Sequence, residues 1–139
     1  MKFVSTRVVT ADLDRMVAFY ELVTGVTAIR PAPVFAELVT PTATFAIGHA
    51  STVPVFAPGA AEPAANRSAI FEFLVDDVDA EYVRLGEAGL EFVTAPALMP
   101  WGNRVFFLRD PDRNLVGLFT PETADAVERF RDRPYATAG

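Results

Sequence analysis

Few residues in this sequence have side chains of the kinds that usually carry chemistry. His49 is the single histidine and ends a strand-like run, and cysteine is absent. Thiolate chemistry, disulfides and cysteine-based zinc sites are therefore excluded, and a Ser/His/Asp triad would depend on His49 alone. Strand alternation places His49 on the face opposite Ala46 and Gly48, which predicts a partly exposed structural residue. Glycine-rich nucleotide-binding loops are also absent.

Trp101 is the only tryptophan, and it lies in a Pro-Trp-Gly sequence just before a strand-like run. A tryptophan on such a loop can stack on a planar or cationic ligand at little entropic cost. A purely structural packing role is equally compatible with the sequence.

Composition limits the classes of partner. The 139 residues are 51% hydrophobic and carry a net charge of −6, without clusters of Lys or Arg. Such a chain is a poor candidate for binding nucleic acid or anionic membranes. No window is apolar enough to span a membrane, and the N-terminus lacks the pattern of a secretory leader. A cytoplasmic protein is therefore expected.

The elements that must position these residues follow a repeated order. A strand at 3–9 precedes a helix capped by Asp12 and closed by Gly25, and three strands follow at 26–30, 34–40 and 44–49. The helix carries an apolar stripe of Leu13, Met16, Val17, Tyr20 and Val23.

The same order recurs after an Ala- and Pro-rich crossover without periodicity. A strand at 70–75, a helix capped by Asp77 and closed by Gly89, and strands at 91–94, 103–109 and 115–120 repeat it. We expect one domain over 1–139: module one at 1–50, an exposed crossover at 51–67, module two at 68–121 and a C-terminal helix at 122–133.

This duplicated β-α-β-β-β order resembles the vicinal oxygen chelate superfamily, which includes glyoxalase I, extradiol dioxygenases and bleomycin-resistance proteins. Four segments carry the resemblance: 8–13 followed by Phe19-Tyr20, 75–80, 100–104 and 110–115. Together they extend it to about residue 121. The resemblance implies an α+β fold in which two tandem βαβββ modules form a curved, cleft-lining sheet with helices on its outer face. The family usually has Gly where Arg113 stands, so we expect strain in that turn to fall on Asn114.

Metal-dependent members of the family bind a divalent ion in the cleft. The family's ligand positions correspond here to Ser5, Ile70 and Gly117, with a looser match at Ala46. A register shift of two at that last strand would give Thr44 or Gly48. None of these side chains suits a hard or borderline cation. We therefore expect neither a metal nor another cofactor.

The same correspondence with the family, combined with strand alternation, predicts that Arg7 and Glu72 face the cleft and that Phe71 faces the helices. The two charges either hold a ligand or neutralise each other. Alternation leaves open which of Asn103 and Arg104 faces the cleft. The expected ligand-binding set is Arg7, Glu72, Trp101 and Arg104.

The resemblance implies a metal-free protein that binds a small organic molecule, planar or cationic, in the manner of bleomycin-resistance proteins that sequester an antibiotic. The alternative is an enzyme of lyase, isomerase or dioxygenase type that uses Glu72 as a base or an unrecognised metal site. A dimeric scaffold without a ligand is a third possibility. A homodimer is expected in any case, because two small curved sheets leave edges and apolar surface to be covered.

Overall fold

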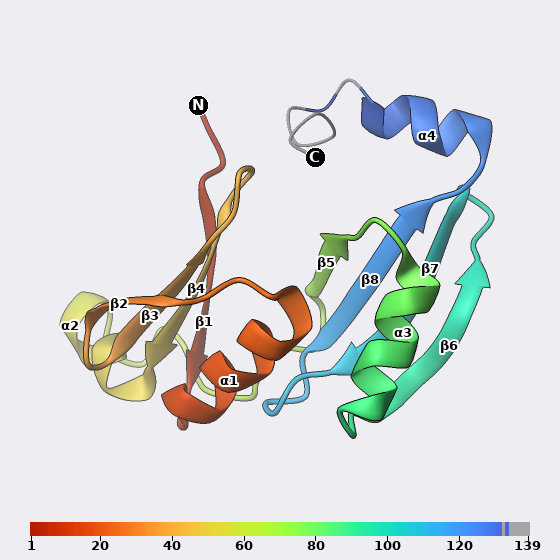
Figure 1. The fold of residues 1–139 in the computed structure, drawn as a ribbon. Helices are drawn as coiled ribbons and strands as arrows, with labels where there is room; N and C mark the ends of the chain where they lie inside the picture. The colour runs from red at the N-terminus through yellow and green to blue at the C-terminus, as the bar shows by residue number, and fades with distance from the viewer. Residues whose placement is uncertain (132, 134–139) are drawn as a thin grey trace. The chain divides into compact units, whose positions relative to one another are not determined.

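The computed structural model describes residues 1–131 and 133, and it has the α+β fold expected from the sequence (Figure 1). The chain divides into two compact units. Met1–Arg67 form the first unit together with the turn Asp110–Arg113, and Ser68–Arg109 form the second with the described residues from Asn114 onward. Each unit contains one four-stranded sheet with its strands and first helix in βαβββ order, which confirms the two tandem modules.

The first sheet has the strand order β1-β4-β3-β2. Its strands are β1 (Ser5–Thr10), β2 (Ile29–Ala32), β3 (Phe35–Val39) and β4 (Thr44–His49), and α1 (Leu13–Thr24) covers one face (Figure 1). β1 runs parallel to β4, whereas β3 is antiparallel to both β4 and β2. β4 is therefore a central strand with a parallel neighbour, β1, on one side and an antiparallel neighbour, β3, on the other.

Local chemistry explains where α1 begins and ends. The Asp12 carboxylate accepts a hydrogen bond from the Arg15 backbone N–H at 3.1 Å, and Gly25 closes the helix with φ of 70°. All five residues of the predicted stripe are buried, against buried residues of β3 and β4 such as Leu38 and Ile47. Burial of this stripe is the main force that holds the helix on the sheet.

The second sheet has the strand order β5-β8-β7-β6. Its strands are β5 (Ile70–Leu74), β6 (Phe92–Leu98), β7 (Asn103–Arg109) and β8 (Leu115–Pro121), and α3 (Val78–Glu87) covers one face (Figure 1). β5 is parallel to β8, so the sheet repeats the pairing of the first. β6 is longer than the predicted strand at 91–94, and two shifts in its register with β7 accompany the added length.

Aromatic rings form the core between α3 and its sheet. Phe106 is fully buried, with its ring centroid 5.4 Å from that of Tyr82 and 5.3 Å from that of Phe92. Phe71 is also buried, whereas its neighbour Glu72 is exposed. This confirms the predicted alternation, in which Phe71 contributes to the core and Glu72 lies on the other face.

Each module ends in a helix that the βαβββ order does not include. β4 continues into a 3-10 turn (Ala50–Thr52) and α2 (Val53–Phe56), and β8 is followed by α4 (Ala124–Arg131). None of the helices within the described residues is long and apolar enough to cross a membrane.

The crossover predicted at 51–67 begins with a short helix that the sequence analysis did not include. The Thr52 hydroxyl donates to the His49 carbonyl at 2.7 Å, His49 Nδ1 accepts from the Ser51 N–H at 3.1 Å, and Val53 is buried. Pro54 also lies in the first turn of α2, where a missing N–H is harmless. These local interactions stabilise a helix of four residues, which is too short to show a periodic pattern.

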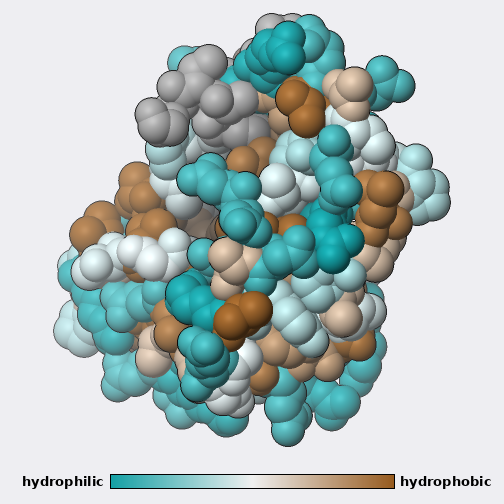
Figure 2. Space-filling view, turned by 45° about the vertical axis from the view of Figure 1, so that its right-hand side comes forward, coloured by the Kyte–Doolittle hydropathy of each residue, from teal (hydrophilic) through white to brown (hydrophobic). Residues whose placement is uncertain are grey.

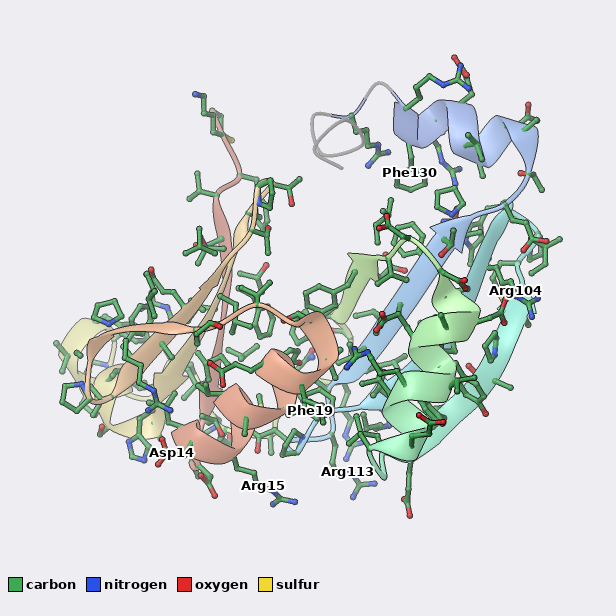
Figure 3. The ribbon with its side chains drawn as sticks, viewed as in Figure 1. Asp14, Arg15, Phe19, Arg104, Arg113 and Phe130 are labelled. Carbon is green, nitrogen blue, oxygen red and sulfur yellow. The ribbon has the colours of Figure 1, made fainter. Side chains whose placement is uncertain are left out.

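The C-terminal helix is shorter than the predicted 122–133. α4 spans Ala124–Arg131, and residue 132 lies outside the described part of the chain. Phe130 points from α4 toward β8, where its ring centroid lies 5.3 Å from that of Phe119 (Figure 3). Phe119 shares a face with Gly117, opposite the face covered by α3, so α4 covers one end of that face.

The turn at Asp110–Arg113 corrects the prediction about strain. Arg113 itself has the positive φ, 68°, whereas Asn114 is not among the residues with positive φ. The Arg113 N–H donates to the Asp110 carbonyl at 2.8 Å, and the Asp112 N–H donates to the Asp110 carboxylate at 2.9 Å. These two bonds close a tight turn, and its fourth residue, Arg113, is the one that adopts the left-handed conformation.

Arg113→Gly is therefore expected to be more stable than Arg113→Ala by about 1 kcal/mol, because Gly adopts positive φ without the Cβ penalty. Both substitutions remove the same side-chain contacts, so the difference isolates the backbone. Urea unfolding of the two variants measures it. Equal midpoints would show that the turn relaxes away from positive φ at no cost.

Candidate functional site

The face of the first sheet opposite α1, which we call the open face, carries a hollow of about 260 Å³. Side chains alternate along β1, β3 and β4, so every second residue of each strand points to this face. Residues lining the hollow include Ser5, Arg7, Phe35, Glu37, Thr44 and Ala46.

Arg7 and Glu37 occupy a single row across the sheet. Arg7 pairs with Ala46 on one side of β4, and Glu37 pairs with the same Ala46 on the other. Ala46 has only a methyl group, so the two charged side chains border one small apolar patch. No ion pair joins either Arg7 or Glu37 to another residue in the described part of the chain.

Arg7 is positioned by aromatic rings. Its guanidinium carbon lies 4.9 Å from the ring centroid of Phe56 in α2 and 6.0 Å from that of Phe35 in β3. Its stem runs past Gly48, where an added Cβ would come within 3.9 Å of the Arg7 Cδ. Cation–π contacts of this kind hold an arginine in place without neutralising its charge. The short helix α2 therefore belongs to the candidate site.

Glu37 was missed by sequence reasoning. Ala36 and Leu38 on either side of it are buried, while Glu37 itself is half-buried on the open face. The alternation of side chains along residues 34–40 could have indicated the face on which Glu37 lies. The pairing with Ala46, which places Glu37 beside Arg7, could be seen only in the register of β3 with β4.

His49 has the structural role predicted for it. Its Nδ1 accepts from the Ser51 N–H and lies 2.8 Å from the Ser51 hydroxyl, so the ring caps the 3-10 turn. His49 also borders a second hollow of about 380 Å³ at the start of α1, together with Asp12 and Asp14. Asp14 is paired with Arg30 at 2.8 Å, and the Asp12 carboxylate caps α1, so their charges already have partners.

The second sheet presents Glu72 on the face opposite α3. Glu72 pairs with Gly117 of β8, which in turn pairs with Phe107 of β7. The Phe107 ring lies over Gly117, since a Cβ added there would come within 2.9 Å of Phe107 Cε1. This face therefore offers one exposed carboxylate beside an aromatic ring.

Arg104 lies on the other face of this sheet, beside α3 (Figure 3). Its Nε donates to the Asp79 carboxylate at 2.9 Å, and Asp79 belongs to α3. This hydrogen bond raises the pKa of Arg104, which stays protonated. Asn103 instead lies on the face of Glu72, where its Oδ1 is buried without a hydrogen-bond partner among the described residues. Arg104 and Glu72 therefore do not form one site.

Trp101 is 55% exposed at the turn before β7, and its carbonyl accepts from Arg129 of α4 at 3.3 Å. Phe107, in the row of Glu72, lies four residues along β7 from Asn103, which is about 13 Å of extended chain. Trp101 comes two residues before Asn103, so along the strand direction it is farther still from the row that contains Glu72. The structure therefore does not bring Trp101 and Glu72 side by side.

Exposed hydrophobic residues do not gather into one large patch on the face shown in Figure 2. Several small patches are separated there by hydrophilic residues. A dispersed pattern is ordinary for a protein surface and does not mark an interaction site by itself.

A family model described as Glyoxalase/Bleomycin resistance protein/Dioxygenase superfamily matches residues 2–118. The chain belongs to this superfamily. The match ends before α4, so the C-terminal helix lies outside the part that the family model describes. A search of curated proteins found none that matches the chain.

Solved structures of the superfamily share the fold. A glyoxalase/bleomycin resistance protein/dioxygenase from Nocardioides is 26% identical, with 89% of this chain and 85% of that chain covered and a TM-score of 0.74. A family enzyme from Burkholderia phytofirmans is 22% identical over 87% and 99% of the two chains, with a TM-score of 0.75. A lactoylglutathione lyase from Agrobacterium tumefaciens is 21% identical over 85% and 92%, with a TM-score of 0.68. The two less similar proteins show the fold alone.

Among the positions that the sequence resemblance assigns to metal ligands, the sheet registers place Ala46 beside Arg7 and Gly117 beside Glu72. The four positions hold Ser5, Ala46, Ile70 and Gly117, and Phe107 fills the space over Gly117. Within residues 1–131 and 133, no three His, Asp or Glu side chains gather closely enough to hold a metal ion. The side chains present therefore do not fit the divalent ion of the metal-dependent members.

Proposed function

We propose that this superfamily member binds a small organic molecule on the open face of its first sheet without a metal ion. The observation that carries the proposal is the hollow bordered by Arg7 and Glu37, two charged side chains without an ion pair to any described residue. Ligand sites typically combine apolar walls with a few polar groups that fix orientation. Phe35, Phe56 and Ala46 supply the apolar part, and the two charges supply the polar part.

Binding alone is sufficient for a sequestering role, in which a protein lowers the free concentration of a harmful compound such as an antibiotic. We propose that role rather than catalysis because the best candidate base, Glu72, has an exposed side chain. A general base is usually tuned by desolvation or by a specific neighbour. The likeness to the lactoylglutathione lyase concerns the fold, and it does not supply the missing metal ligands.

Metal independence provides the test. Protein treated with a chelator should keep its melting temperature when Zn²⁺, Ni²⁺, Mn²⁺ or Fe²⁺ is added one at a time. A panel of small organic acids, amines and amphoteric compounds should contain members that raise the melting temperature equally with and without chelator. A ligand at a hundred times its Kd adds about 2.7 kcal/mol, which shifts a domain of this size by several degrees.

Arg7→Ala is the matched variant for this panel, because it removes the guanidinium and leaves Ser5, Glu37 and Thr44 in place. We expect it to abolish the shifts caused by anionic compounds. A stoichiometric metal ion that stabilises the parent protein, or ligand shifts that disappear with chelator, would overturn the proposal.

A further inference from the structure

We infer that the ligand of the open face is amphoteric, with an anionic group that meets Arg7 and a cationic ammonium group that meets Glu37. This inference rests on the proposed function and names the class of compound that the site selects. It starts from two opposite charges held on one face of the same sheet.

The geometry follows from the strand pairing. Arg7, Ala46 and Glu37 lie in register on β1, β4 and β3, which are neighbours in the sheet. Adjacent strands are about 4.8 Å apart, so the Cα atoms of Arg7 and Glu37 are about 10 Å apart. The methyl group of Ala46 leaves the space between them open. A small molecule over Ala46 therefore lies between the strand that carries Arg7 and the strand that carries Glu37.

The two charges stay separate because Arg7 is held away from Glu37. The Arg7 stem runs toward Gly48, and its guanidinium stacks on Phe56 at 4.9 Å, both away from the Ala46 row. A ligand with a single charge would satisfy one side chain and desolvate the other without a partner. In the free protein Arg7 is exposed and Glu37 is half-buried, so a ligand that covers both must replace water at each charge, and a charge left without a partner lowers the affinity. An amphoteric ligand compensates both.

The rest of the lining indicates the shape of the compound. The hollow of about 260 Å³ is small, and Phe35 forms one of its walls. Pockets for drug-sized ligands usually measure about 300–1,000 Å³. The hydroxyls of Ser5 and Thr44, which are register partners, border the opposite side and can bond either charged group. A compact ligand with one aromatic ring, of the size of an aromatic amino acid, fits these features.

Three probes of matched size test the inference by calorimetric titration: phenylalanine, 3-phenylpropanoate, which lacks the ammonium group, and 2-phenylethylamine, which lacks the carboxylate. Phenylalanine should bind at least about tenfold more tightly than either single-charge probe, as expected for a charge-assisted contact. Glu37→Gln should reduce phenylalanine affinity by about tenfold and leave that of 3-phenylpropanoate unchanged. Arg7→Gln should reduce phenylalanine affinity similarly and spare 2-phenylethylamine.

Glu87→Gln provides the control, since it makes the same chemical change at an exposed residue of α3 in the second unit. It should leave all three affinities unchanged. If a single-charge probe binds as tightly as phenylalanine and Arg7→Gln or Glu37→Gln abolishes that binding, the amphoteric class is wrong and the proposed site remains. If none of the three probes binds the parent protein at millimolar concentration, the inferred ligand class is overturned, whereas the wider panel with and without chelator decides the proposed function.

Discussion

Replacing Tyr20 by Phe is expected to lower the free energy of unfolding by about 2–3 kcal/mol. Tyr20 is fully buried, and its hydroxyl donates to the Asp110 carboxylate at 2.6 Å. Asp110 is itself only 4% exposed, and it belongs to the turn that forms part of the first unit. Hydrogen bonds to charged groups contribute about 1.5–3 kcal/mol, and loss of the donor leaves a buried carboxylate poorly solvated.

The same hydrogen bond should make the stability depend on alkaline pH. Burial, reinforced by the negative charge of Asp110, raises the pKa of Tyr20 above its ordinary value of 10.0. A group whose pKa is raised on folding contributes its full stability below the unfolded pKa and loses it as the pH rises further. The advantage of the parent protein over Tyr20→Phe should therefore shrink above pH 10 by about 1.4 kcal/mol per pH unit.

Urea unfolding of both proteins from pH 7 to pH 11 measures the two effects together. Tyr82→Phe is the control, since Tyr82 packs against Phe92 and Phe106 and its hydroxyl forms no hydrogen bond with a described residue. It should change stability by less than about 0.5 kcal/mol. Equal losses in the two variants would show that the Asp110 contact contributes nothing specific.

Much of this fold was accessible from sequence because its signals are local. Asp12 and Asp77 cap their helices as predicted, and β4 and β7 have the predicted bounds. Such elements are defined by caps and alternation within about ten residues. The assignment of Arg7 and Glu72 to the faces away from the helices rested on the same alternation, together with the positions that the resemblance gave to Ser5 and Ile70.

The candidate site was less accessible because it depends on pairing between distant segments. Glu37 becomes a neighbour of Arg7 only through the register of β3 and β4, and Phe56 reaches Arg7 from a helix too short to predict. Arg104 could not be assigned to a face, since the Pro-Trp-Gly loop before it fixes no parity. Its partner Asp79 is 25 residues away. Register and long-range contacts are not contained in local patterns.

Gly102→Ala is expected to lower the stability of the second unit by about 2–5 kcal/mol. Gly102 has φ of 96°, where an L side chain costs about 1–2 kcal/mol. A Cβ there would overlap the Thr123 hydroxyl and lie 2.8 Å from the Ala126 Cβ, which adds about 1–3 kcal/mol for overpacking. The Gly102 carbonyl also accepts the N–H groups of Glu122 and Thr123, so the substitution acts where α4 is attached to the sheet.

Release of α4 would separate Phe130 from Phe119 and uncover one end of the second sheet. Trp101, the only tryptophan, adjoins Gly102 and is hydrogen-bonded through its carbonyl to Arg129 of α4, so its fluorescence reports on this attachment. We expect the Trp101 emission of the variant to differ from that of the parent protein. We also expect faster proteolysis in the segment that follows Pro121.

Gly86→Ala in α3 is the matched control for this substitution. An added Cβ at Gly86 meets nothing closer than 3.5 Å, and Gly86 is not among the residues with positive φ. Helix propensity alone predicts that this change is neutral or stabilises the protein by as much as about 1 kcal/mol. If Gly102→Ala matched Gly86→Ala in both stability and Trp101 emission, α4 would contribute little to the second unit, because it could detach without a measurable cost.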